Sequence, residues 1–336
     1  MQNPKVSVLV PVYNCAKFLP KTLESILAQD YENFEVVVTD NCSTDGSGKI
    51  ARDYAKKDSR VRVVGHEENI GYVKNLNSGL REAVGDYIAF LHADDLWQPN
   101  FLSSSIELFG KNPDAGMCFC RYENIDSEGR PHSVRARNAL EGGSRALSSD
   151  ELFEMYVGRD FTPVCTVIVA RKAQQAAGEY DIRFQGPCDY QMWLKIAYNF
   201  GGIYNSRSTS KYRIHSASGF FTQHENNVLL TEQYIMSIFF FAEYATKQKD
   251  DARYKKMLLR NTALSALRQS VDAISKGKGE VARRKSGFCI SCYGGVLEQL
   301  CAVGIFFASF LTFVLAPIFG IIIKIGLPVL KRLKLY

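Results

Sequence analysis

The first hundred residues of the chain alternate between short apolar runs and amphipathic stretches. In residues 18–27, for example, Phe, Leu and Ile recur at helical spacing. The apolar runs, rich in β-branched residues, are residues 6–12, 34–40, 61–65 and 87–95. Buried strands separated by helices are typical of a parallel sheet covered on both faces. We therefore predict an α/β fold, with a helix opened by Ser43, Thr44 and Asp45 after the second strand.

Residues 148–215 are predicted to complete this sheet. Residues 162–173 and 203–215 have strand patterns, and residues 189–201 have a helical pattern. The spacing of apolar residues then stays helical from 224 to 275. We therefore expect three parts: an α/β domain over 1–220, a helical extension with a basic linker over 221–285, and a membrane-associated segment over 286–336.

Acidic residues end two of the predicted strands. Asp40 ends the second strand, and Asp94 and Asp95 end the fourth. In parallel sheets, ligands bind beyond the carboxyl ends of the strands, so we expect all three side chains at one ligand-binding edge. Asp40 could there accept hydrogen bonds from a nucleobase, and Tyr13 at the end of the first strand could supply an aromatic face. The alternative for Tyr13 is an ordinary core aromatic.

The sequence lacks the usual glycine-rich phosphate loops. No glycine occurs in "PVYNCAKFLP" after the first strand, and no G-x-x-x-x-G-K-[ST] occurs anywhere. A divalent cation held by Asp94 and Asp95 could neutralise phosphates instead, because Mg²⁺ and Mn²⁺ prefer oxygen ligands. The alternative is that the Asp pair caps a helix, but its position at the ligand edge favours the cation.

The formal charge of +6 is concentrated in the tail. Residues 276–336 hold nine Lys and Arg and two Glu, so the remainder of the chain has a net charge of −1. A near-neutral body argues against a nucleic-acid-binding surface on the main domain. The nine scattered cysteines are typical of reduced thiols in a cytosolic protein, and Cys289-x-x-Cys292 has no second pair to complete a zinc site.

Six blocks, taken in their order and spacing, resemble family 2 glycosyltransferases with the GT-A fold. The resemblance covers roughly residues 4–220, and it implies a Rossmann-like, mostly parallel sheet flanked by helices. The blocks are "VSVLVPVYN", "VVVTDNCSTDGS", "ENIGYVKNLNSGL", "GDYIAFLHADDLW", "CDYQMWLKIA" and "YRIHSASGF".

The resemblance implies a nucleotide-sugar site at the ligand edge. Base and ribose would contact Pro11, Tyr13 and Asp40. The nucleotide pocket would be lined by Asn69, Gly71, Asn77 and Gly79.

The resemblance also implies a cation, Mn²⁺ or Mg²⁺. The family motif D-x-D-D has His92 in place of its first Asp, which leaves the role of His92 in doubt. Asp95 would be the main metal ligand, and Asp94 would bind ribose or metal. Arg213 and His215 would approach the diphosphate and metal, with ordinary packing as the alternative for His215.

Asp189 matches the catalytic base of the family. As a general base it would remove a proton from the acceptor hydroxyl, although an isolated Asp, with a pKa of about 3.9, is a weak base. The alternative is that Asp189 caps the helix that follows it. Trp193 in that helix favours core packing over a sugar-stacking platform.

A charge-free run of 24 residues, 300–323, dominates the tail. As a helix it would reach roughly 36 Å, enough to cross a bilayer core of about 30 Å. Basic segments flank it on both sides, which favours a hairpin or re-entrant segment near Pro317 over a single span. A buried core helix is the weaker alternative.

Together these features predict a metal-dependent, inverting glycosyltransferase at the cytoplasmic face of the plasma membrane, building bacterial surface polysaccharide. Expected partners are a nucleotide-sugar donor, UDP-linked by preference, a polyprenyl-linked or oligosaccharide acceptor, and membrane lipids. Two alternatives stay open: a nucleotidyltransferase on a similar sheet, and a non-catalytic, membrane-tethered nucleotide-sugar-binding protein.

Overall fold

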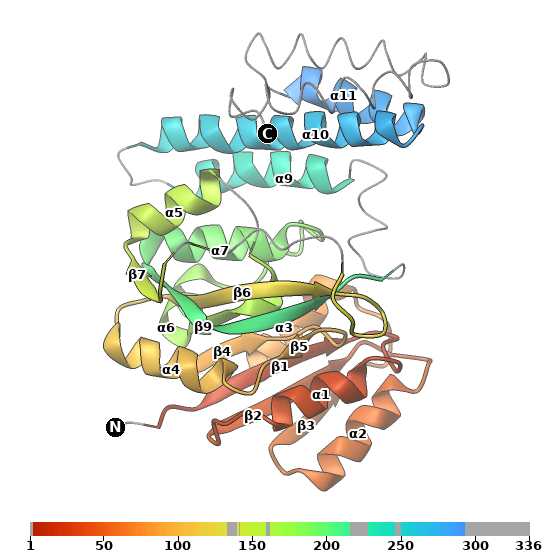
Figure 1. Ribbon diagram of the computed structural model, residues 1–336, viewed down its shortest axis with the longest axis vertical. Helices are drawn as coiled ribbons and strands as arrows, with labels where there is room; N and C mark the ends of the chain where they lie inside the picture. Colours follow the sequence, from red (N-terminus) through yellow and green to blue (C-terminus); the bar gives the residue numbers. More distant parts are fainter. Residues whose placement is uncertain are drawn as a thin grey trace. The chain divides into compact units, whose positions relative to one another are not determined.

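The computed structural model describes residues 3–132, 140, 142–158, 162–215, 228–245 and 250–292. The chain divides into two compact units, Met1–Ser216 and Ala217–Tyr336. The first unit holds all the strands of the described residues and all the candidate site residues (Figure 1).

The first unit is built on a mixed sheet with the strand order β3-β2-β1-β4-β8-β6-β9-β5. The first four strands in this order are mutually parallel. Next, β8 is antiparallel to β4, β6 is antiparallel to β8, and β9 is parallel to β6. The strands are β1 (Val6–Val12), β2 (Phe34–Asp40), β3 (Val61–Gly65), β4 (Tyr87–Phe90), β5 (Leu96–Trp97), β6 (Met117–Ile125), β7 (Arg145–Leu147), β8 (Val167–Ala170) and β9 (Gly202–Arg213).

This topology gathers the carboxyl ends of six strands at one edge. Strands β1, β2, β3, β4, β6 and β9 all run in the same direction. These carboxyl ends form the predicted ligand-binding edge. Strand β9, which follows much later in the sequence, also ends there.

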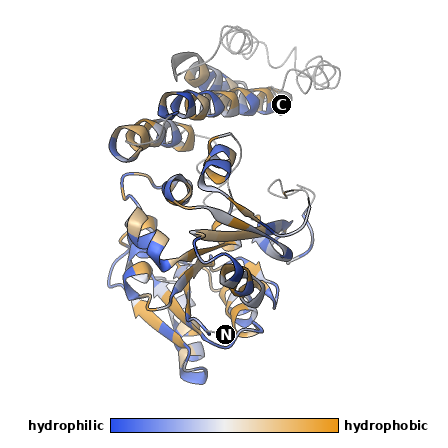
Figure 2. Cartoon of the chain, turned by 90° about the vertical axis from the view of Figure 1, so that its left-hand side faces the viewer, coloured by the Kyte–Doolittle hydropathy of each residue, from blue (hydrophilic) through white to orange (hydrophobic). Residues whose placement is uncertain are grey.

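Strands β1 and β2 are buried along their whole length. Every residue of β1 and β2 is buried, as their continuous apolar patterns require. Pro11 fits within β1 because the pairing with β4 stops at Leu9, so its missing N–H breaks no ladder on that side. The hydropathy colours in Figure 2 show apolar stretches in the strands of the sheet, and the flanking helices carry both colours.

Seven helices and one short 3-10 turn belong to the described part of this unit. Helix α3 packs on β1 and β2, α4 on β9 and β6, and α7 contacts α5 and α6. The elements are α1 (Leu19–Leu27), α2 (Ser47–Lys57), α3 (Tyr72–Glu82), α4 (Phe101–Lys111), α5 (Ser149–Gly158), η1 (Val164–Thr166), α6 (Arg171–Ala177) and α7 (Cys188–Asn199).

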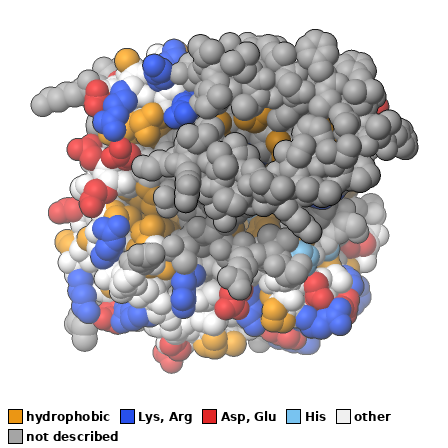
Figure 3. Space-filling model, turned by 45° about the horizontal axis from the view of Figure 1, so that its top comes forward, with side chains coloured by type: hydrophobic (Ala, Val, Ile, Leu, Met, Phe, Trp, Pro, Cys, Tyr) orange, Lys and Arg blue, Asp and Glu red, His pale blue; other side chains and the backbone are white. Residues whose placement is uncertain are grey.

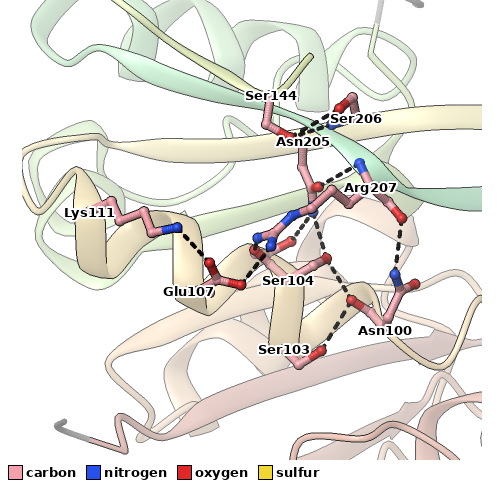
Figure 4. Close-up of polar contacts among 10 residues, drawn as sticks. Asn100, Ser103, Ser104, Glu107, Lys111, Ser144, Asn205, Ser206 and Arg207 are labelled. Carbon is pink, nitrogen blue, oxygen red and sulfur yellow. Dashed lines mark hydrogen bonds and ion pairs between the residues drawn. The ribbon is translucent and has the colours of Figure 1, made fainter.

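A polar network fastens α4 to β9 away from the candidate site (Figure 4). Glu107 accepts hydrogen bonds from Lys111 and Arg207, which lowers its pKa to about 2. The Asn205 side-chain amide donates a hydrogen bond to the Ser104 hydroxyl at 2.8 Å. Because both cations are paired with the same carboxylate, we read this cluster as a structural joint, beside a surface hollow of about 450 Å³.

The second unit is helical over its described residues. A cluster of Leu230, Ala263, Ala266 and Cys289 forms part of its core. Its elements are α9 (Val228–Phe239), the π-helical turn η2 (Phe240–Tyr244), α10 (Asp251–Ser275) and α11 (Gly279–Cys292). On the face shown in Figure 3, acidic and basic side chains are intermingled.

No helix among the described residues has the length and apolarity needed to cross a membrane. The apolar run 300–323 lies outside the described residues. The membrane-associated segment therefore stays a prediction.

Several sequence predictions are corrected by the structure. The strand predicted over 87–95 ends at Phe90, because the chain turns there and resumes only as the short β5. The strand predicted over 162–173 is reduced to β8, between the turn η1 and helix α6. Strand β6 is absent from the sequence predictions, and two of the strands in the sheet order, β8 and β5, run against the parallel direction.

Candidate active site

Asp40 ends β2 in a closely packed pocket at the ligand edge. Its side chain is buried, and its Oδ1 accepts a hydrogen bond from the Ser43 N–H at 3.1 Å. A Cβ atom at Gly48 would lie 2.1 Å from Asp40 Oδ2, so only glycine lets α2 approach this carboxylate. The first turn of α2 thus forms one wall of the Asp40 pocket.

Tyr13 lies beside this pocket and is 48% exposed. Its neighbour Val12 pairs directly with Asp40, so the ring follows the end of β1 next to the Asp40 pocket. The exposure rules out the alternative of a core aromatic. An open aromatic face next to a carboxylate is suited to stacking a nucleobase.

The loop that carries Tyr13 is fixed to the start of α2. Asn14 has a positive φ of 51° and accepts a hydrogen bond from the Thr44 N–H at 2.8 Å. Asp45 accepts hydrogen bonds from the Ala16 and Ser47 N–H groups. Ser43 and Thr44 therefore join two loops instead of capping α2, whose N-cap is Gly46.

Three further residues predicted to line the nucleotide pocket hold loops in place. Asn69 accepts from the Asn41 amide at 2.9 Å and from the Gly71 N–H at 3.0 Å. Asn77 is buried, and its amide forms hydrogen bonds with both the N–H and the C=O of Tyr180. Gly71 has a φ of 87°, which favours glycine as the N-cap of α3. Direct nucleotide contact by these residues stays a prediction; what they visibly do is shape the pocket.

Asn77 also lines a cavity of about 550 Å³. The cavity lies between α3 and residues 179–182, and His66, Lys74 and Arg81 contribute to its lining. It adjoins the loop after β3, beside the predicted nucleotide pocket.

The carboxylates of the fourth strand lie in a tight turn. Asp95 N–H donates to the His92 carbonyl, and the Thr22 hydroxyl donates to the Asp95 carbonyl. No helix begins here, since β5 follows directly and α4 starts only at Phe101. The helix-cap alternative for Asp94 and Asp95 is therefore wrong.

Arg213 and His215 reach this turn from the end of β9. The Arg213 N–H donates to Asp95 Oδ1 at 2.8 Å, and its Nε donates to the Asp94 carbonyl at 2.6 Å. His215 Nε2 lies 2.9 Å from Asp94 Oδ2. Phe18 supports both side chains, with its ring 4.8 Å from the His215 ring and 4.9 Å from the Arg213 guanidinium.

Asp95 has an unsatisfied oxygen. Its side chain is only 1% exposed, and its Oδ2 makes no hydrogen bond of normal geometry among the described residues, although the nearby Cys165 thiol lowers the pKa of the carboxyl slightly against the larger effect of burial. Burial, and then the charge of Asp94, raises the pKa of Asp95 well above its usual range. A buried carboxylate in this situation is stabilised by a bound cation.

The residues present fit a divalent cation. Ligand atoms of His92, Asp94 and Asp95 all lie within 4.8 Å of one another. Two adjacent carboxylates at the ligand edge supply the kind of oxygen ligands that Mg²⁺ and Mn²⁺ prefer. The orphaned Asp95 oxygen is the observation that points most directly to such a ligand.

Asp189 lies in the first turn of α7 and is 6% exposed. Its Oδ1 accepts from the Tyr190 N–H at 2.7 Å, but the N-cap of α7 is Pro187, so the helix-capping alternative is wrong. Burial nevertheless raises the pKa of Asp189 to about 7. The weak base expected from the sequence is therefore a base matched to neutral pH.

Aromatic side chains connect Asp189 with the cation site. Burial, and then the charges of Asp95, Asp94 and Asp189, raises the pKa of Tyr212. Tyr72 lies within electrostatic reach of Asp189, and its hydroxyl contacts His92 Nε2 at 2.7 Å. The two carboxylate groups therefore belong to one site. Trp193 is fully buried and donates to the Thr162 carbonyl, which confirms its predicted role in the core.

The sequence reasoning missed several contributors. Phe18 underlies Arg213 and His215, and Thr22 fixes the carboxylate turn. Burial, and then the charge of nearby Asp94, raises the pKa of the Cys15 thiol to about 12. Tyr72 stood within a recognised block and could have been found, whereas Phe18 and Thr22 belong to an ordinary amphipathic helix pattern.

Solved structures with the same fold include TarS of S. aureus and a mannosyltransferase of Pyrobaculum calidifontis. S. aureus TarS 1–349, in complex with UDP-GlcNAc, has a TM-score of 0.65 and 18% identity, over 91% of this chain and 89% of that one. The mannosyltransferase PcManGT from Pyrobaculum calidifontis, in complex with GDP-Man and Mn²⁺, has a TM-score of 0.58 and 19% identity, over 97% and 87%. The chain thus has the α/β GT-A fold of glycosyltransferases.

The family model described as glycosyl transferase family 2 matches residues 7–171. The chain therefore contains a glycosyl transferase family 2 domain. The match ends within the first unit and contains every strand-end carboxylate of the site.

Curated relatives agree with this assignment. An uncharacterized glycosyltransferase of Rickettsia prowazekii is 30% identical over 218 residues, which cover 64% of this chain and 65% of that protein. TuaG of Bacillus subtilis, named as a putative teichuronic acid biosynthesis glycosyltransferase, is 37% identical over 129 residues, or 38% of this chain and 51% of TuaG. The match to this chain thus spans about half to two thirds of the length of these relatives.

Proposed function

We propose that the protein moves a sugar from a nucleoside-diphosphate sugar to an acceptor hydroxyl, in a cation-dependent reaction that inverts the anomeric carbon. The observation that carries the proposal is the buried, unpartnered Asp95 oxygen at the carboxyl edge of the sheet. It lies beside Asp94 in an edge that also holds Tyr13 and Asp40. A divalent cation held there would balance the negative charge of these carboxylates and of a bound diphosphate.

The donor would occupy the ends of β1 and β2. The Tyr13 ring is exposed for stacking on a base, and Asp40 is positioned to accept hydrogen bonds from base or ribose. The loops fixed by Asn69 and Asn77 would close the remaining sides of the nucleotide pocket. UDP is the nucleotide we favour, by analogy with the fold neighbour TarS and its UDP-GlcNAc complex.

Asp94 and Asp95 would hold the cation, with His215 completing the site from β9. When bound, Mn²⁺ or Mg²⁺ supplies positive charge that stabilises the departing nucleoside diphosphate. Arg213 fixes the geometry of both carboxylates through its backbone and side-chain hydrogen bonds.

Asp189 would take the proton from the acceptor hydroxyl. Its raised pKa, about 7, lets it accept that proton more strongly than an ordinary carboxylate at neutral pH. Attack from the Asp189 side, opposite the leaving diphosphate, would be a single displacement and would invert the anomeric carbon.

Acceptor and location are part of the same proposal. A relative named for teichuronic acid biosynthesis supports a cell-surface glycan as product. The charge-free run 300–323 with its basic flanks supports attachment to the cytoplasmic face of the plasma membrane and a lipid-linked or oligosaccharide acceptor.

A thermal-shift panel tests the donor half of this function. Nucleoside diphosphates and their sugars are added to the full chain, with Mn²⁺ or with EDTA. We expect one nucleotide series to raise Tm clearly with Mn²⁺ and much less with EDTA, since ligand binding to the folded state stabilises it. No stabilisation by any nucleotide, or equal stabilisation with EDTA, would contradict the proposal.

A further inference from the structure

His92 is the residue of the carboxylate turn to which the proposed function gives no role. Its side chain is 28% exposed, and its Nδ1 lies 3.9 Å from Asp95 Oδ2. That oxygen is the buried one without a hydrogen-bond partner among the described residues. A ring nitrogen and an unsatisfied carboxylate oxygen therefore face each other across a gap too long for a good hydrogen bond.

Tyr72 fixes the opposite side of the His92 ring. Its hydroxyl lies 2.7 Å from His92 Nε2, and the two rings meet edge to face at 5.8 Å. With a proton on Nε2 donated to the Tyr72 oxygen, Nδ1 carries the lone pair and points to the carboxylates. Histidines that bind metals have this arrangement, in which the other ring nitrogen donates to an oxygen acceptor.

The spacing of the three candidate ligand atoms fits one ion. They lie within 4.8 Å of one another. Two ligands on opposite sides of an ion, each at about 2.0–2.2 Å, are separated by little less than this. A small closure of the turn would thus bring His92, Asp94 and Asp95 onto a common ion.

We propose that His92 Nδ1 is a nitrogen ligand of the cation held by Asp94 and Asp95, and that it shifts the preference of the site from Mg²⁺ towards transition ions. Imidazole favours ions such as Co²⁺ and Ni²⁺, whereas a site of carboxylates and water suits Mg²⁺ and Mn²⁺. The inference rests on the cation site of the proposed function and adds to it a determinant of ion choice.

The experiment measures ion affinities of the full chain, using the metals alone. Binding of Mn²⁺ is followed by the electron paramagnetic resonance of the free ion, and Co²⁺ and Mg²⁺ are measured by competition. In His92→Asp we expect the ratio of the Mg²⁺ Kd to the Co²⁺ Kd to fall by about tenfold or more, the scale on which changes around a metal site act. His132→Asp makes the same chemical change outside the cluster and should leave the ratio as in the wild type.

Two further measurements test whether the His92 ring itself is a ligand of the ion. Mn²⁺ bound to the wild type should show ¹⁴N electron-spin-echo modulation that is weaker in His92→Asp. Tyr72→Phe keeps the ring but removes the oxygen that orients His92, so Co²⁺ affinity should fall by about tenfold. Circular dichroism and Tm verify folding, and His92→Asn replaces His92→Asp if the latter does not fold.

The outcomes separate the two proposals. If the wild type binds no Mn²⁺, both the cation site and the role of His92 are overturned. If the wild type binds Mn²⁺ but His92→Asp leaves the ion ratio and the ¹⁴N modulation unchanged, only the His92 inference is overturned. Unchanged Co²⁺ affinity in Tyr72→Phe overturns the orienting role of Tyr72.

Discussion

Replacing Asp189 with asparagine is expected to lower the kcat of sugar transfer by about 10²- to 10⁴-fold, the usual contribution of a general base. The amide keeps the shape of the side chain and can still accept the hydrogen bond from the Tyr190 N–H. It cannot take a proton from the acceptor. Donor affinity, measured by calorimetry, should stay within about threefold of the wild type because Asp189 is not among the residues proposed to hold the donor.

The pH profile gives this prediction a second readout. Because the pKa of Asp189 is about 7, the wild-type rate should fall about tenfold per pH unit below pH 7 and level off above it. The residual rate of Asp189→Asn should not show this fall below pH 7.

The raised pKa of Asp189 should also make the free energy of unfolding depend on pH, with stability falling as the rate of transfer rises. The folded-state pKa of about 7 lies above the ordinary value of 3.8, so the folded protein holds a proton that the unfolded chain releases. The free energy of unfolding should therefore fall as pH rises from about 4 to about 7, and this slope should be smaller in Asp189→Asn.

Asp114→Asn is the matched control, since Asp114 is fully exposed and its nearest cation, Lys172, is 3.7 Å away. It should leave kcat and both pH profiles unchanged. An Asp189→Asn enzyme that kept more than about a tenth of the wild-type kcat would remove Asp189 from the mechanism.

The second large effect is expected at Asp95. Asp95→Asn should abolish measurable Mn²⁺ binding and lower kcat/KM by about 10²- to 10³-fold, since electrostatic stabilisation of the leaving group would be lost. The carbonyl oxygen of the introduced amide can still accept from the Arg213 N–H, so the turn should keep its shape.

Stability distinguishes loss of the ion from loss of the fold. Without metal at pH 8, Asp95→Asn should be at least as stable as the wild type in urea unfolding, because it removes a buried carboxylate charge whose Oδ2 makes no hydrogen bond among the described residues. With Mn²⁺ the order should reverse, since only the wild type gains from binding. A variant that is less stable in EDTA, or that still binds Mn²⁺ as tightly as Asp114→Asn, would contradict the assignment of Asp95.

The sequence predicted the first two strands well because they are buried on both faces. The ranges 6–12 and 34–40 agree with β1 and β2, whose mostly apolar runs leave little choice of structure. The range 61–65 also agrees with β3, which is only partly buried. Strand β6 escapes such prediction, because it is buried at both ends but carries exposed and half-buried residues between them, and its register with β9 shifts at Cys120. Its pattern has neither the period of two nor a continuous apolar run.

The candidate site was only partly predictable for a different reason. The edge position of Asp40, Asp94 and Asp95 follows from strand order alone. The hydrogen bonds from Arg213 to the carboxylate turn join residues 118 and 119 positions apart. The raised pKa of Asp189 depends on what buries it in the folded chain, which no local pattern encodes.

A cation-dependent single displacement, with Asp189 as the base, must invert the anomeric carbon. The anomer of the released sugar therefore reports directly on this mechanism. The nucleotide sugar selected by thermal shift is hydrolysed without acceptor, samples are quenched with EDTA, and early ¹H NMR spectra identify the anomer before mutarotation. We predict that the sugar first appears with the anomeric configuration opposite to that of the donor, only when a divalent cation is present. Release of the retained anomer first, or an equal rate in EDTA, would contradict the account.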